Sequence, residues 1–109
     1  MGFTSATIHL DDKYCFPHHR DQYGNIDRAV IDRLMALLLA AGWISSVALA
    51  EDSETITLAL VDPINSGVER AEEWLETNVL AVAGEYADVI ETVTISNRWR
   101  YRPPLVVSE

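Results

Sequence analysis

The chain has 109 residues, of which 49% are hydrophobic, and its net charge at pH 7 is -9. This length suits a single domain over residues 1–109, and the hydrophobic content excludes a disordered chain. The longest apolar run, Leu34–Ile44, is too short to cross a bilayer. The first residues lack a basic segment followed by an apolar one, so we expect no secretory signal. The single Cys15 excludes an internal disulfide and favours a reducing, cytoplasmic location.

The acidic residues are concentrated in one part of the chain. Eleven of the 17 Asp and Glu residues lie between positions 51 and 97, where the only base is Arg70. The first fifty residues are close to neutral, and the last twelve carry Arg98, Arg100 and Arg102 against Glu109. Such a field repels nucleic acid and anionic membranes and attracts basic protein surfaces. We therefore expect no direct nucleic-acid or membrane partner.

The first half of the chain predicts a strand, a long loop and a helix. Apolar and polar residues alternate over 4–10, which is typical of a half-buried strand. Residues 11–25 form a long connection. Asn25 is a suitable N-cap, and apolar residues recur at helical spacing as far as Ala41. Residues 34–41 are apolar on all sides, so this part of the helix must be buried deeply or covered by a partner.

The second half predicts two strands, a helix and a final strand. Residues 43–50 and 55–61 form the two strands, joined by a hairpin turn over 51–54. Residues 62–67 then interrupt the chain, and Ser66 with Glu69 has the capping-box spacing that begins a helix. The last strand is expected over 89–101, followed by an extended C-terminal tail over 103–109.

The order β-α-β-β-α-β is typical of the ferredoxin-like α+β fold, in which two helices cover one face of an antiparallel sheet. Alternation places mostly hydroxyl side chains on the uncovered face: Thr7, His9, Thr57, Ala59, Thr94 and Ser96. Domains of this fold that bind RNA need exposed aromatic residues there. The hydroxyl-rich face therefore argues against an RNA-binding module. It indicates a solvated face or a flat dimer contact.

Four glutamates share one side of the second helix, opposite its apolar stripe, and we call them the acidic ridge: Glu69, Glu72, Glu73 and Glu76. Capping and the helix dipole explain part of this pattern. The absence of compensating bases is not explained in that way. We therefore interpret the acidic ridge, extended by Glu51, Asp52 and Glu54 of the hairpin, as a contact surface for a basic protein.

The 11–25 loop and the strand before it hold the residues with the most reactive side chains: His9, Cys15, His18, His19 and Arg20. Cys15 and His18 have the spacing of two zinc ligands, but a tetrahedral site needs four and no second pair exists, so we predict neither metal nor cofactor. A nucleophilic pair of Cys15 and His18 lacks an identifiable orienting group.

A packed loop is the alternative to a reactive site. In that arrangement Tyr14, Phe16 and Tyr23 anchor the loop, while the group His18–Arg20 faces solvent or a partner. Tyr and Arg are favoured in protein interfaces, so the loop could itself contribute to one.

The segment Arg98–Arg102 alternates arginine with aromatic residues. We expect its arginines to pair with the acids of the domain itself. The overhanging strand and the 103–109 tail could also pair with an edge strand of a second chain, which would make a homodimer.

Three functions remain open. The size and charge are similar to those of toxin-immunity proteins and phage anti-CRISPR proteins, a resemblance of physical type without a shared motif. The first hypothesis is therefore a small acidic binding protein, not an enzyme, that inhibits a basic nucleic-acid-handling protein such as a nuclease toxin. The second is a ligand- or metal-binding domain, or an enzyme, that uses the 11–25 loop. The third is a structural homo-oligomeric subunit.

Overall fold

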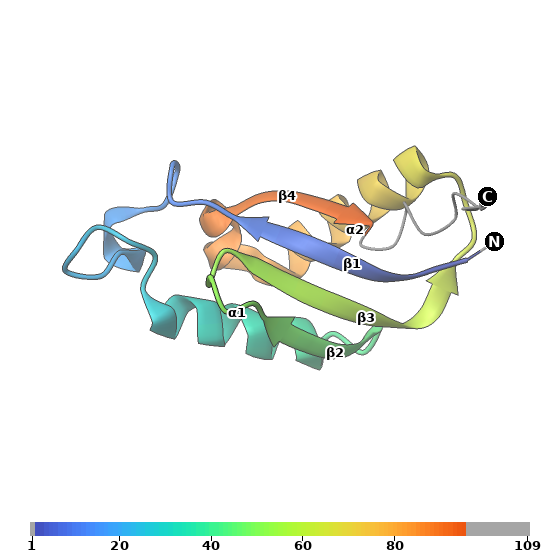
Figure 1. Cartoon of the computed structure of the whole chain (residues 1–109), viewed down its shortest axis with the longest axis horizontal. Helices are drawn as coiled ribbons and strands as arrows, with labels where there is room; N and C mark the ends of the chain where they lie inside the picture. Colours follow the sequence, from blue (N-terminus) through green and yellow to red (C-terminus); the bar gives the residue numbers. More distant parts are fainter. Residues whose placement is uncertain (1, 96–109) are drawn as a thin grey trace, which may run out of the picture.

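The computed structural model describes residues 2–95 (Figure 1). It contains the six predicted elements in the predicted order: β1 (Phe3–Leu10), α1 (Arg28–Ala40), β2 (Ile44–Leu49), β3 (Thr55–Ile64), α2 (Val68–Ala83) and β4 (Ile90–Ile95). Two short 3-10 helices, η1 (Pro17–His19) and η2 (Gly84–Val89), lie in the connections. The residues predicted to form the end of the last strand and the tail, 96–109, lie outside the described part.

The four strands form one antiparallel sheet in the order β2-β3-β1-β4. Each helix joins two strands that are not neighbours, so β1 and β3 become the central pair. This is the ferredoxin-like arrangement that the sequence predicted. Alternate residues of the strands are buried beneath α1 and α2, and the remaining residues form an open face (Figure 1).

The core lies between the sheet and the two helices. Its fully buried members come from every layer: Ile8, Leu34, Leu38, Ile56, Leu58, Leu75, Val79 and Val89. Burying one such side chain contributes about 1.5–3 kcal/mol. The core therefore fixes both helices against the sheet, and with them the connections at each end of the molecule.

The helix α1 begins two residues later than predicted. Its N-cap is Asp27, whose carboxylate accepts a hydrogen bond of 3.0 Å from the amide of Ala29. The predicted N-cap, Asn25, is still part of the loop, because its amide donates to Asp21 Oδ1 and because Ile26 pairs with Arg20 in a β-bridge. These bonds hold the chain extended as far as Asp27.

Two predictions at the start of α2 were wrong. The N-cap is Gly67 and not Ser66, whose hydroxyl donates to the carbonyl of Gly67 instead of closing a capping box. The strand β3 also continues through the predicted break as far as Ile64. Pro63 lies where the register between β1 and β3 shifts, so its missing N–H falls outside the regular ladder.

The apolar half of α1 is only partly covered. Leu34 and Leu38 are fully buried, whereas Leu37 and Leu39 remain exposed on the helix surface. Neither helix of the described residues has the length and apolar content to cross a membrane.

Candidate functional site

The 11–25 loop, the N-terminus of α1 and the β2–β3 hairpin meet at one end of the molecule, at the left of Figure 1. We call this the loop end. At this end, β1 is connected to the hairpin, because the amide of Leu10 donates a hydrogen bond of 2.8 Å to the carbonyl of Glu54. The topology therefore places the predicted loop site beside the hairpin acids, although the sequence separates them by thirty residues or more.

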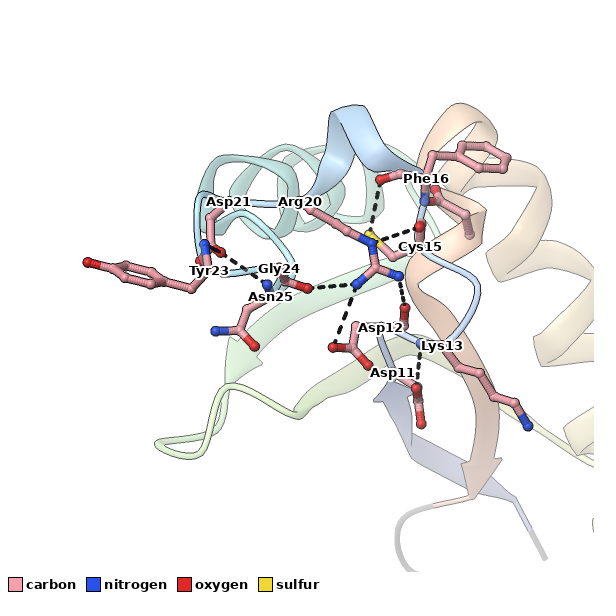
Figure 2. A network of polar contacts seen from close by, with 11 residues as sticks. Asp11, Asp12, Lys13, Cys15, Phe16, Arg20, Asp21, Tyr23, Gly24 and Asn25 are labelled. Carbon is pink, nitrogen blue, oxygen red and sulfur yellow. Dashed lines mark hydrogen bonds and ion pairs between the residues drawn. The ribbon is translucent and has the colours of Figure 1, made fainter.

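Arg20 organises the loop from its centre (Figure 2). Its guanidinium donates to three backbone carbonyls, those of Cys15 at 3.1 Å, Gly24 at 2.6 Å and Asp12 at 2.5 Å. It also lies 3.8 Å from the carboxylate of Asp12. A guanidinium can donate five hydrogen bonds in a fixed geometry, so it satisfies carbonyls that no strand or helix pairs. Arg20 is therefore occupied in holding the loop.

A second turn in the loop is held by Asp21. Its Oδ1 accepts from the amides of Tyr23 at 2.8 Å and Asn25 at 3.0 Å (Figure 2). Gly24 adopts a positive φ of 85°, which a residue with a side chain rarely adopts. These local bonds give the tip of the loop one defined backbone path.

His19 and Asp88 form the buried anchor of the loop. The ring Nδ1 lies 2.9 Å from the Asp88 carboxylate, and both side chains are about 5% exposed or less. The same carboxylate accepts from the amide of Phe16 at 2.8 Å. Burial raises the pKa of Asp88, but the bonds from Phe16 and His19 and the charge of a protonated His19 outweigh it, so the pKa is lowered.

The predicted orientation of the loop side chains was wrong in its main feature. Tyr14, Phe16 and Tyr23 do not anchor the loop, because they are 75%, 50% and 78% exposed. The buried histidine is His19, which was expected to face solvent or a partner. The physical reason is that the loop's backbone amides and carbonyls need polar partners. The His19–Asp88 pair and Arg20 supply these polar partners, so the aromatic rings remain exposed to solvent.

Cys15 does not have the environment of a reactive thiol. It is buried, and its sulfur donates to the carbonyl of Phe16 at 3.6 Å. Burial raises the pKa of the thiol, and the neighbouring Asp88 raises it further. Reactive cysteines instead have a lowered pKa and an accessible sulfur. The geometry therefore gives no support to a Cys15–His18 nucleophilic pair.

The remaining histidines do not gather around Cys15. His18 is exposed and stacks on the ring of Phe16, with 5.7 Å between ring centroids. His9 lies on the open face of the sheet, where its Nε2 shares a hydrogen bond of 3.1 Å with Thr94. Among residues 2–95, no three His, Cys, Asp or Glu side chains come together in a way that could hold a metal ion.

The loop end contains an acidic cleft of about 470 Å³ between the 11–25 loop and the hairpin. Four carboxylates line it, two from each side: Asp11, Asp12, Asp52 and Glu54. Arg20 compensates only Asp12, at 3.8 Å. The sequence had assigned the hairpin acids and the loop to different hypotheses, and the structure brings them into one place.

The acidic ridge lies away from this cleft. Glu69, Glu73 and Glu76 are exposed on the first half of α2, near the C-terminal end of β3. The hairpin with Glu51 precedes the other end of β3, ten residues away, a separation of roughly 30 Å at the usual rise of a strand (Figure 1). The predicted acidic surface is therefore two separate clusters.

Glu72 differs from the other glutamates of the acidic ridge. It is half-buried, and its Oε2 accepts a hydrogen bond of 2.9 Å from the amide of Ile95 on β4. This carboxylate connects α2 to an edge strand of the sheet, so its role in the described structure is structural.

Asp88 is the residue that the sequence did not associate with the loop. Its partner His19 is 69 positions away in the chain, and no local pattern indicates that pairing.

No model of a protein family, no curated protein and no solved structure that we compared with the chain matches the chain. The loop end itself therefore provides the observations that bear on function.

Proposed function

We propose that this protein binds and inhibits a basic, nucleic-acid-handling protein, and that the loop end is its contact surface. The observation that carries the proposal is the acidic cleft: four carboxylates from two distant segments line one cavity, and the ion pair described there joins Arg20 to Asp12 alone among residues 2–95. A cavity lined by one sign of charge focuses the electric field and attracts the opposite charge. The ligand that fits it best is an arginine or lysine side chain of the partner.

Exposed aromatic residues on the 11–25 loop, outside the lining of the cleft, support a protein partner. Tyr14, Phe16 and Tyr23 are exposed on the loop that forms one wall of the cleft. Tyrosine is enriched among the residues that contribute most to the stability of protein interfaces. Because Arg20 and Asp21 fix the loop backbone before any partner arrives, less conformational entropy is lost on binding.

The sign of the charge supports the inhibitory role. A protein that handles nucleic acid presents cationic side chains to phosphates. Carboxylates arranged in a cleft occupy those side chains and prevent the nucleic acid from reaching them. We place the protein in the cytoplasm, because its one cysteine is unpaired and buried, as is usual under reducing conditions.

The contact surface is tested with an oligoarginine peptide as the cationic probe. Changing Asp52→Asn together with Glu54→Gln removes two charges from the cleft, and Asp52→Asn keeps the oxygen that accepts from the Glu54 amide. We expect association at low salt to slow by about three- to tenfold, because steering depends on local charge. Stopped-flow fluorescence of the labelled peptide measures this rate.

The matched control is Glu69→Gln with Glu76→Gln, which removes the same charge from α2 and should slow association much less. Equal slowing by both pairs would show that only the overall charge attracts the peptide, and the cleft would no longer be the contact surface. Inhibition itself is measured as protection of a nucleic acid from basic nucleases of the source organism. If the protein protects the nucleic acid from none of these nucleases, the proposed inhibitory role is contradicted.

A further inference from the structure

The described positions of the open face that pair in regular register carry no Asp, Glu, Lys or Arg, and the exposed Glu91 lies at the bulge of the edge strand β4. The face is formed mainly by small hydroxyl or apolar residues on all four strands: Ser5, Thr7, His9, Ser46, Ala48, Thr55, Thr57, Ala59, Val61, Thr92 and Thr94. The register confirms the common side, because Thr57 lies between Thr7 and Ala48 in the sheet. His9 has the largest side chain among these residues.

The helical side of the same molecule is very different. The exposed surface of α1 carries Arg28, Asp32 and Arg33, and that of α2 carries Glu69 and its neighbours. Charged residues are the ones that proteins leave in water most often, and they are depleted in the centre of protein interfaces. A face whose regularly paired positions carry no Asp, Glu, Lys or Arg, in a chain where 23% of residues are charged, therefore has the composition of a contact surface.

We propose that two copies of this chain pair through their open faces. The net charge of -9 makes two copies repel each other wherever carboxylates come together. The regularly paired positions of the open face present no carboxylate to a second copy, so self-association through this face costs little in charge repulsion. The paired positions of this face offer no Lys or Arg to bind the phosphates of a nucleic acid. A basic protein is attracted instead to the carboxylates on other surfaces of the molecule.

The shape and size of the open face fit this occupant. A flat face pairs with itself about a two-fold axis, and stacked sheets pack about 10 Å apart. Four strands of six to ten residues at ordinary spacing cover roughly 500 Å² on each copy, so the pair buries roughly 1,000 Å². This area reaches the lower limit of specific interfaces, so we expect a reversible dimer. The shared hydrogen bond between His9 and Thr94 keeps the largest side chain close to the sheet.

Sedimentation velocity of the full chain, at tens to hundreds of micromolar, tests the proposal. Thr57→Lys places one charge on each side of the two-fold contact and should raise the dimer dissociation constant about tenfold or more. Ala48→Lys, on the exposed edge strand β2, gives a second variant if the first folds poorly. Thr77→Lys, exposed on α2, makes the same change of net charge and should leave the constant unchanged or lower it.

Far-UV circular dichroism verifies that each variant is folded. A wild-type chain that stays monomeric at the highest concentration would overturn the proposal. A wild-type dimer that Thr57→Lys and Ala48→Lys leave intact would also overturn it, and would direct attention to contacts of residues 96–109. Equal weakening by Thr57→Lys and Thr77→Lys would show an effect of net charge alone.

Discussion

At the scale of single residues, the loop end depends on polar side chains that satisfy the backbone. Arg20 bonds three carbonyls, and Asp88 accepts from the Phe16 amide and from His19. An unpaired backbone group in such a place costs as much as a lost hydrogen bond, about 1–3 kcal/mol. The sequence indicated His19 and Arg20 as candidates for chemistry, but their contacts in the structure make them supports for a loop that exposes its aromatic rings.

Asp88 should make the stability of the protein depend on pH. Its pKa is lower when folded than when unfolded, so the folded state favours the carboxylate. The stabilisation is therefore complete above the unfolded pKa, near the ordinary value of 3.8, and is lost as the pH falls through the lower folded pKa. Asp88→Asn should cost about 1–3 kcal/mol at neutral pH and weaken this dependence.

Urea denaturation at a series of acidic and neutral pH values measures both effects. Glu85→Gln removes an exposed carboxylate three residues away and serves as the matched control. An Asp88→Asn variant as stable as the wild type at neutral pH would show that the bonds to Phe16 and His19 contribute nothing.

Arg20→Lys separates the role of charge from that of geometry. A lysine keeps the positive charge but cannot reach three carbonyls in a planar fork, so we expect a loss of about 1–3 kcal/mol in the free energy of unfolding. Hydrogen exchange of the loop amides should also become faster, in particular at Asn25 and Gly24. Arg28→Lys, at an exposed ion pair with Asp32 on α1, is the control and should have little effect.

At the scale of elements, periodicity predicted the helices and strands well and their ends less well. The alternation over β1 and the apolar stripe of α2 depend on burial against one core, which a sequence records directly. The start of α1 depends instead on a β-bridge between Arg20 and Ile26, and the end of β3 on a register shift opposite Phe3. Such pairings join distant or irregular backbone segments, so local patterns do not contain them.

The start of α1 gives a direct test of its N-cap. Asp27→Ala removes the carboxylate that accepts from Ala29 and should destabilise the protein by about 1 kcal/mol. Asn25→Ala alters the residue that helix periodicity indicated as the cap, and it should have a smaller effect. Thermal unfolding of both variants measures the difference. An equal loss for the two would mean that Asp27 does not act as the N-cap.

At the scale of the whole molecule, the hairpin acids and the acidic ridge, which the sequence suggested as one surface, become two clusters at opposite ends of β3. Helical spacing correctly placed Glu69, Glu73 and Glu76 together, but it could not show that Glu72 bonds to Ile95. The acidic cleft could not be predicted either, because Asp11 and Asp12 meet Asp52 and Glu54 only after the sheet has formed. Charge composition thus led us to expect a basic partner, and topology decides where the charges meet.

The buried thiol of Cys15 provides a built-in probe of this end of the molecule. Its sulfur is covered while the loop is closed, so a thiol-specific reagent reacts with it only in open states. The rate of labelling, compared with that of the unfolded chain, therefore gives the free energy of opening the loop separately from that of global unfolding. Because the chain has a single cysteine, the signal needs no assignment and reports when a bound partner holds the loop closed.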